Sequence, residues 1–277
     1  MLPLIVDESF ENKILDISQE EYHARRDCVH SSSLKNIIKS PHAYKYFIEK
    51  PIEETPSMKL GTITHEFYLE GDIALSKYVV EPVFSGFTKD GVPTTSLNAA
   101  SVKQAKAEWY AQLPSDSKVM SQSERDKLMF MIDSLLNHKF VQEVFKDGVA
   151  EYKKQWRDPS TGLACISSDD FVSLKHDIFV ELKTTTSSKW EDFRKNGVER
   201  LNYPFQYAFY NRGHKEVLGR SLKERVWVAQ ESVAPYECRV HWIDDFYVKS
   251  GEIQVARAMR DLRNSIVTGK QIGRAHV

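Results

Sequence analysis

The chain has 277 residues, of which 41% are hydrophobic, and its formal net charge at pH 7 is −1. That length and hydrophobic content suffice for one large domain with a real core, while no apolar run approaches the length of a membrane span. The near-neutral charge is not the signature of a nucleic-acid-binding protein, although grouped bases can line a DNA path on a neutral protein.

The three cysteines are widely separated and form neither a CxxC pair nor a disulfide framework. Three thiolates cannot supply the four that an iron–sulfur cluster usually takes, so we expect no cluster. The N-terminal sequence MLPLIVDESFENK is acidic and does not resemble a signal peptide. We therefore expect a cytoplasmic protein.

Two short helices are predicted near the N-terminus, after an irregular lead-in over residues 1–20. Ser31–Ser33 precede the apolar-periodic run LKNIIKS, and Pro41 ends it, which is the pattern of a capped helix. A second helix is predicted over Ala43–Ile48. Lysines on this pair, beginning with Lys35, fit either a plain amphipathic surface or a wall beside a substrate.

The segment Lys59–Glu70 predicts a longer helix. Gly61 and His65 are four residues apart and share one of its faces. A lone helical histidine is more often a structural residue than a ligand. Glu66 and Glu70 are further candidates, and either is equally compatible with a solvent-facing acid.

The middle of the chain predicts loops and then helices. Residues 72–97 combine a short strand with turn-rich sequence that could form a mobile flap. Helices are predicted over Leu97–Leu113 and Ser121–Phe145. The strand Glu151–Arg157 follows, and its alternation puts Lys154 on the face opposite Glu151. Glu151 lies one strand before the next motif and could help to shape a metal site.

The stretch Cys165–Thr186 predicts two strands joined by a tight turn. With Lys175–His176 as a two-residue loop, Asp170 lies directly opposite Glu181, at about 5 Å between β-carbons. Two carboxylates at that separation repel each other unless a proton or a cation lies between them. Lys183 shares the face of Glu181. The pattern is that of two acids for a divalent metal and one ammonium for a developing anion.

Two interpretations of this hairpin compete. Acids and lysines on a strand pair commonly form a solvated face. The run from Ile178 to Leu182 is nevertheless mostly apolar, as in strands buried on both faces, so Glu181 and Lys183 would need partners there. Thr184 lies at the end of the strand, where its hydroxyl could contact a phosphate.

Further helices and strands complete the prediction. Helices are expected over Trp190–Lys195 and Tyr203–Asn211, the second ended by Gly213. Gln206 and Tyr210 share one helical face, which could contact a phosphate, order a water or simply form a surface. Two strands and a long helix follow, at Glu224–Gln230, Tyr236–Trp242 and Asp244–Val267.

The combination of these motifs resembles a known family. The arrangement D-x10-E-x-K, with an upstream Gly-x-x-x-His and a downstream Gln-x-x-x-Tyr, resembles the PD-(D/E)xK nuclease superfamily. The segments GLACISSDDFVS, VELKTTTSS and NYPFQYAFYNRG resemble the nuclease domain of exodeoxyribonuclease VIII, the RecE-type exonuclease of prophages. The resemblance runs from about Ile17 to about Lys270.

The resemblance implies roles for individual residues. Asp170, Glu181 and His65 would hold Mg²⁺ or Mn²⁺, with the Leu182 carbonyl as a further ligand. Lys183 would act on the attacking water or on the transition-state charge. The remaining candidates are Gln206 for orienting phosphate or water and, as supporting residues, Glu151, Tyr210 and Thr184. Asp169 remains an alternative to Asp170, because Ser168–Asp169 stands where the family usually has Arg-Pro or similar residues.

The expected fold is one α/β domain over residues 1–270, with a central mixed β-sheet flanked by helices. An N-terminal helical part, about 17–145, precedes a catalytic core, about 149–270. The C-terminal sequence QIGRAHV has no structural logic after a helix, and residues 271–277 are expected to be an artefactual tail that resembles a translated sequencing adaptor.

The resemblance also implies a substrate and partners. It suggests a 5′-to-3′ exonuclease on the ends of linear double-stranded DNA, acting in phage recombination with a RecT-type annealing protein. It further suggests a ring-shaped homo-oligomer and no membrane. Two alternatives stay open, namely a structure-specific or restriction-type endonuclease with the same site and a DNA-binding module whose site has decayed.

Overall fold

The computed structural model describes residues 2–50, 55–71, 77–115 and 117–269. The expected C-terminal tail therefore lies outside the described residues, as does part of the expected flap. The helices are α1 (Gln19–Ala24), α2 (Ser31–Leu34), the 3-10 helix η1 (Lys35–Ile38), α3 (Pro41–Glu49), α4 (Pro56–Glu70), α6 (Ala100–Ala111), α7 (Gln122–Leu136), α8 (Lys139–Val144), α9 (Trp190–Phe193), the π-helix η2 (Arg194–Glu199), α10 (Tyr203–Leu218) and α11 (Asp245–Thr268).

A six-stranded mixed sheet forms the centre of the molecule, in the order β1-β6-β7-β8-β9-β10. Only β8 and β9 run parallel, and the segment from α9 to α10 connects them. The strands of this sheet are β1 (Lys13–Ile14), β6 (Val149–Arg157), β7 (Ala164–Ser173), β8 (Ile178–Thr185), β9 (Glu224–Glu231) and β10 (Cys238–Trp242). The predicted α/β class, a mixed sheet flanked by helices, is confirmed.

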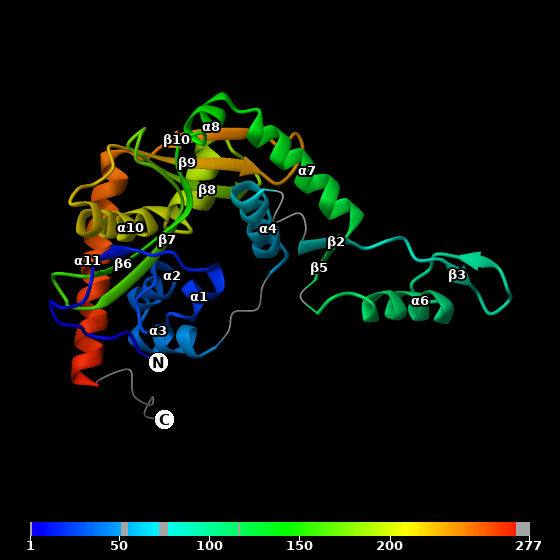
Figure 1. The fold of residues 1–277 in the computed structure, drawn as a ribbon, viewed down its shortest axis with the longest axis horizontal. Coiled ribbons are helices and arrows are strands. Elements are labelled where there is room, and N and C mark those ends of the chain that lie inside the picture. The colour runs from blue at the N-terminus through cyan, green and yellow to red at the C-terminus, as the bar shows by residue number, and fades with distance from the viewer. Residues whose placement is uncertain (1, 51–54, 72–76, 116, 270–277) are drawn as a thin grey trace.

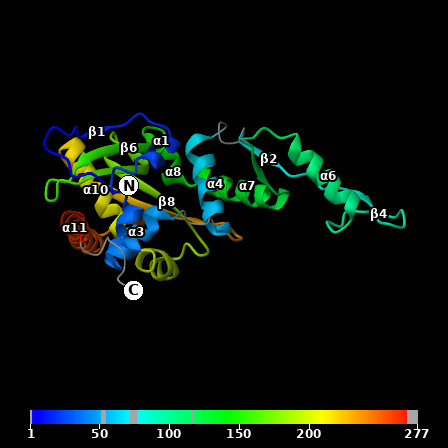
Figure 2. The same ribbon diagram turned by 90° about the horizontal axis from the view of Figure 1, so that it is seen from below.

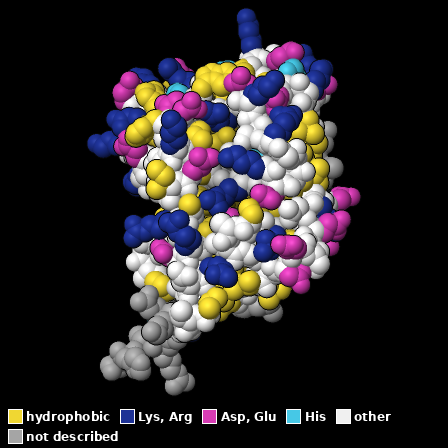
Figure 3. Space-filling view, turned by 90° about the vertical axis from the view of Figure 1, so that its left-hand side faces the viewer, with side chains coloured by type: hydrophobic (Ala, Val, Ile, Leu, Met, Phe, Trp, Pro, Cys, Tyr) yellow, Lys and Arg dark blue, Asp and Glu magenta, His cyan; other side chains and the backbone are white. Residues whose placement is uncertain are grey.

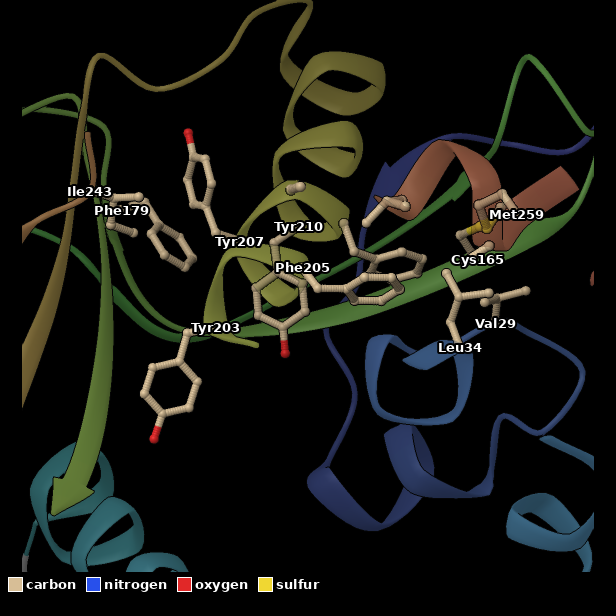
Figure 4. Close-up of a cluster of buried hydrophobic side chains, with 14 of the residues drawn as sticks. Val29, Leu34, Cys165, Phe179, Tyr203, Phe205, Tyr207, Tyr210, Ile243 and Met259 are labelled. Atoms are coloured by element: carbon tan, nitrogen blue, oxygen red, sulfur yellow. The ribbon is translucent and has the colours of Figure 1, made fainter. Parts of the chain in front are cut away.

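Helices cover both faces of this sheet, as Figure 1 shows. On one face α10 and α11 bury a cluster that includes Trp156, Phe179 and Trp227. Figure 4 shows the tyrosines of α10 beside Phe179 of β8 within this cluster. On the other face α7 and α8 pack on Val180 and Leu182. Strand β8 is therefore buried on both sides, as its apolar run predicts.

An arm, residues 81–115, extends away from this body in both ribbon views (Figures 1 and 2). It contains the short hairpin of β3 (Gly86–Phe87) and β4 (Pro93–Thr94), together with α6. The parallel pair β2 (Tyr78–Val80) and β5 (Lys118–Met120) joins the arm to α4 and α7. The turn-rich sequence predicted the loops of this region but not its extension from the body.

Several predicted boundaries are wrong for physical reasons. Helix α10 continues through Gly213, where an added β-carbon would stand 2.7 Å from Lys154 Cε and 2.8 Å from the Trp156 ring. The glycine thus permits close helix–sheet packing, and Gly219, with φ of 71°, ends the helix in the left-handed conformation instead. The supposedly irregular lead-in contributes β1 and α1.

The β7–β8 turn spans residues 174–177 instead of two residues, and Asp177 has φ of 54°. Because the longer turn has the same centre, the expected register is kept, and Phe171 pairs with Val180.

Figure 3 shows Lys and Arg interspersed with Asp and Glu on the face beside α11. Within the described ranges, no helix is both long and apolar enough to span a membrane.

Candidate active site

The candidate site lies where β7 and β8 separate. The paired ladder between these strands ends at Phe171 and Val180, so Asp170 and Glu181 are the first residues beyond it. The Leu182 N–H donates to Asp170 Oδ2 at 2.7 Å instead of joining the β7 ladder. A backbone amide that a regular hairpin would use for sheet pairing thus holds a carboxylate at the edge of the site.

Side chains change face at this point of the sheet. Asp169 contacts residues of α10, whereas Phe171, two positions on, stacks on Phe145 at the end of α8. Residues two apart in a regular strand share a face, so the strand is distorted between them. Glu151, which lies opposite on β6, has φ of 52°. The distortion directs Asp170 to neither core and leaves its carboxylate at the cleft.

Glu181 is held from the α10 side. Its side chain is 3% exposed, and Lys183 Nζ lies 2.8 Å from its Oε1. Gln206 Nε2 donates to the same oxygen, and Gln206 Oε1 accepts from Lys183 at 3.1 Å. Gln206 Nε2 also lies 3.0 Å from the Tyr210 hydroxyl. The residues predicted from D-x10-E-x-K and Gln-x-x-x-Tyr therefore meet around one carboxylate.

Helix α4 supplies the opposite side of the site. His65 Nδ1 lies 3.5 Å from Asp170 Oδ1. The helix touches the end of β8 at Gly61, where an added β-carbon would stand 3.4 Å from Thr184 Oγ1. Gly61 and His65 are about one helical turn apart. The Gly-x-x-x-His spacing therefore lets α4 approach β8 closely at the glycine and places the imidazole one turn later, beside Asp170.

The two carboxylates differ in their electrostatics. Burial raises the pKa of Glu181 to about 8, and the neighbouring Asp170 acts in the same direction. Burial also works against ionisation of Asp170, but His65 and Lys183 lower its pKa below the usual value. The pKa of His65 is raised, because Asp170 outweighs burial. Without a cation, burial and Asp170 therefore favour a protonated Glu181, and Lys183 opposes them.

The donor set fits a hard divalent cation. Glu181 Oε2 is buried without a hydrogen-bond partner in the described part of the chain, while Oε1 is fully engaged. A cation that bound Oε2 together with Asp170 and His65 would satisfy that oxygen. Among the described residues, no three His, Cys, Asp or Glu side chains form a ready-made metal cage. Side chains would therefore have to shift for all three predicted ligands to converge on one ion.

A cleft of about 960 Å³ opens above these residues. Its floor includes Glu151, Asp170 and Gln206. One wall comes from α4, and the other from α1, α2 and the first residue of η1, Lys35. Lys35 Nζ donates to the Leu201 carbonyl at 3.0 Å, and burial and Lys183 lower its pKa to about 8. The cleft thus combines an acidic floor with a cation on its wall.

The structure also places the secondary candidates. The Glu151 carboxylate accepts from Ser168 Oγ at 2.8 Å and from Gln19 of α1, so it ties the wall to the floor. Glu66 contacts Lys118 at 2.5 Å and accepts from Tyr78 at 2.8 Å, which ties α4 to the β2–β5 pair. The Glu70 side chain lies outside the described residues.

The alternative ligand, Asp169, is not in the cleft. It is fully buried and contacts Lys154 of β6 and His214 of α10. We call Lys154, Asp169 and His214 the buried cluster. The sequence analysis missed it, although the placement of Lys154 between Tyr152 and Trp156 on one strand face was a usable signal. It also missed the α1 wall, because the lead-in carries no strong periodic pattern.

With the geometry described, the chain can be compared with known proteins. A family model for a PDDEXK-like domain of unknown function (DUF3799) matches residues 30–272. The chain belongs to this family. Membership supports a nuclease, and PDDEXK nucleases generally use divalent metal ions.

Solved structures were compared as well. A candidate exonuclease from Eubacterium rectale superposes with a TM-score of 0.59 at 11% identity, over 95% of this chain and 96% of that chain. An alkaline exonuclease from Laribacter hongkongensis aligns over 91% of this chain and 96% of that chain, with 13% identity and a TM-score of 0.35. At this identity, the first comparison shows a shared fold. No curated protein matches the sequence.

Proposed function

We propose that the protein is a metal-dependent exonuclease that hydrolyses phosphodiester bonds at the ends of linear double-stranded DNA. The observation that carries the proposal is the buried Glu181 Oε2, which has no partner among the described residues and lies directly behind Gln206, a residue that lines the cleft together with Asp170. A purely structural network would leave no buried carboxylate oxygen without a partner. An acidic pair with one free oxygen, next to a lysine, is better explained by a bound cation and a phosphate.

Asp170, Glu181 and His65, with the Leu182 carbonyl, are the residues that would hold Mg²⁺ or Mn²⁺. When bound, the ion supplies a more acidic water and polarises the scissile phosphate. Binding requires Glu181 to lose its proton, which the cation favours by replacing it electrostatically. The Leu182 amide keeps Asp170 oriented during this change.

Lys183 and Gln206 act on the reacting groups. The Lys183 ammonium lies beside Glu181, and burial is outweighed by Glu181 and Asp170, so its pKa is raised and it stays charged. A charged lysine there stabilises the negative charge that develops on the phosphate and orients the attacking water. Gln206 presents both an acceptor and a donor and can order that water, with Tyr210 fixing its amide.

The finer features of the proposal depend on the sequence resemblance. They are 5′-to-3′ polarity, a role in phage recombination with a RecT-type annealing protein, a ring-shaped homo-oligomer and a cytoplasmic location. The Lys35 wall opposite an acidic floor is compatible with a DNA strand in the cleft, because phosphates need cations near them.

A nuclease assay on linear and closed circular duplex DNA tests the proposal. We expect linear DNA to be degraded with Mg²⁺ or Mn²⁺, closed circles to be spared, and both to survive in excess EDTA. Asp170→Asn serves as the inactive control. Cutting of closed circles would instead identify an endonuclease. DNA binding without any metal-dependent cleavage would identify a binding module, and cleavage in EDTA would refute the metal assignment.

A further inference from the structure

The buried cluster has no role in the proposed reaction. Lys154 Nζ lies 2.5 Å from Asp169 Oδ1 and 2.6 Å from Oδ2, and His214 Nε2 lies 2.6 Å from Oδ2. All three residues are 0% exposed. Burial and Lys154 lower the pKa of His214, so its neutral ring donates Nε2–H to Asp169. The cluster is therefore one ion pair with a neutral donor.

Stability alone does not account for an ion pair at this place. The surroundings are large apolar side chains, including Trp156 and Phe179. Removing an ammonium and a carboxylate from water is unfavourable, and apolar residues of similar volume often stabilise a core as well or better. An ion pair differs from apolar packing in that it fixes the direction of its groups.

The cluster is connected to the cleft along α10. Gln206, Tyr210 and His214 follow one another at four-residue spacing and so share a helical face. Gln206 contacts Glu181, Tyr210 contacts Gln206, and His214 contacts Asp169. Lys154 Nζ also lies 5.5 Å from the centre of the Tyr210 ring. The buried cluster thus anchors α10 at His214, one turn beyond Tyr210 and two turns beyond Gln206, which contacts Glu181.

A second connection runs through β7. Asp169 is the residue before Asp170, and the strand changes face immediately after it. Two contacts to Lys154 and one to His214 fix Asp169 on the α10 side. The position of Asp169 in turn fixes where the distortion begins, and therefore which way Asp170 points.

We propose that Lys154, Asp169 and His214 are positioning residues, which aim Asp170 into the cleft and hold Gln206 against Glu181. This inference rests on the proposed function only in taking Asp170 and Glu181 as metal ligands. Residues that orient metal ligands from outside are worth about 10–100-fold in metal affinity or activity. The cluster should therefore affect metal binding without touching the metal.

The decisive variant replaces the ion pair by apolar side chains of similar size, Lys154→Met with Asp169→Leu. We expect it to fold with a lower melting temperature than the parent, because the buried Nε2–H of His214 loses its acceptor, but to remain folded at the temperature of the assays. We expect calorimetry on the full chain without DNA to give Mn²⁺ affinity at least about tenfold weaker, with single-turnover cleavage reduced to a similar degree. Arg212→Met is the matched control, because Arg212, also on α10, pairs with the buried Asp158 at 2.7 Å, away from the cleft.

The outcomes separate positioning from mere stabilisation. A folded double variant that binds Mn²⁺ and cleaves like the parent would overturn the inference, as would an equal loss of Mn²⁺ affinity in Arg212→Met. If the double variant does not fold, His214→Gln and His214→Leu replace it. The glutamine amide can still donate to Asp169, so only the leucine variant should lose Mn²⁺ affinity, and equal affinity in both would overturn the inference. A parent that binds Mn²⁺ but cleaves no DNA would refute the proposed function and leave the calorimetric comparison intact.

Discussion

Two clusters of charged residues meet at Asp169 and Asp170 of β7: the buried cluster, and a second one, here called the cleft cluster, made of Asp170, Glu181, Lys183, Gln206 and Tyr210. They differ in whether both oxygens of a carboxylate have partners. In the buried cluster, both oxygens of Asp169 have partners, and no part of it is exposed. In the cleft cluster, Glu181 is buried just behind the cleft lining and has one oxygen with two donors and one with none among the described residues. The Asp169 carboxylate is complete and specifies structure, although Nδ1 of its partner His214 is buried without a partner among the described residues, whereas an incomplete carboxylate beside a cleft is a place for a ligand. The same residue types can therefore have different roles one residue apart.

Paired amide substitutions should separate the two clusters most strongly. Asp170→Asn should lower cleavage at least about a thousandfold, equivalent to about 4 kcal/mol of lost metal-dependent stabilisation. Asp169→Asn leaves Lys154 charged in the core and should lower the free energy of unfolding by about 3–5 kcal/mol. Denaturant unfolding and single-turnover rates on both variants measure the contrast.

The reverse result would exchange the roles assigned here. If Asp169→Asn folded normally and lost activity while Asp170→Asn stayed active, the metal ligand would be Asp169. Such a result would also mean that β7 does not change face where the structure places the distortion.

Lys183 should affect the rate of cleavage more than DNA binding. It contacts Glu181 and Gln206, with 14% of its side chain exposed. A group that acts on the transition state is worth roughly 10²–10⁴-fold in rate. Lys183→Ala should therefore bind duplex ends nearly as well as the parent in Ca²⁺ and cleave them at least about a hundredfold more slowly in Mg²⁺. An equal fall in affinity and rate would make Lys183 a DNA contact.

Much of the cleft cluster could be predicted because local patterns determine it. Strand alternation put Glu181 and Lys183 on one face, and helical spacing put Gln206 and Tyr210 on another; the structure brings these four residues together. The centre of the turn, Lys175–His176, sufficed to predict the register even though the turn is longer. Such relations depend on a few neighbouring residues and on fixed periodicities.

The buried cluster and the distortion could not be predicted in the same way. Regular alternation separates Asp169 from its neighbour but does not say that Phe171 turns to the other core, because that depends on packing against Phe145. A glycine weakens a helix in isolation, and only the close approach of α10 to Lys154 and Trp156 shows why Gly213 lies inside this one. These features depend on residues far apart in the chain.

The two clusters should also respond to pH in opposite directions. Burial raises the pKa of Glu181 to about 8 from 4.5, so between these values the native state holds a proton that the unfolded chain has released. The metal-free protein should therefore lose stability as the pH rises through this range. The pKa of Asp169 is lowered, because Lys154 and His214 outweigh burial, so its contribution is lost as the pH falls below about its unfolded value of 3.8.

Thermal melting in EDTA across pH tests this difference. Glu181→Gln should remove most of the decline between pH 4.5 and about 8 and leave the loss of stability below about pH 3.8 unchanged. A decline of the same size in the parent and in Glu181→Gln would show that Glu181 is already ionised in the metal-free protein. The charge on Glu181, whose Oε2 has no partner among the described residues, would then have to be balanced by a group other than a proton.

The smallest effect is expected at Lys35, where the cleft cluster continues onto the wall. Its side chain is half-buried, its one hydrogen bond in the described structure goes to the Leu201 carbonyl, and no described carboxylate forms an ion pair with it. If a DNA phosphate becomes its partner, Lys35→Met should weaken duplex-end binding in Ca²⁺ a few-fold and reduce the salt dependence by about one unit of slope. Lys39→Met is the control, because Lys39 is exposed nearby and does not line the cleft.

Burial and Lys183 lower the pKa of Lys35 to about 8, so the salt-dependence slope of the parent should itself approach that of Lys35→Met as the pH rises past this value. An unchanged slope with a lower melting temperature would mean that Lys35 only anchors the segment before α10, and that this wall of the cleft has a structural role and no contact with DNA.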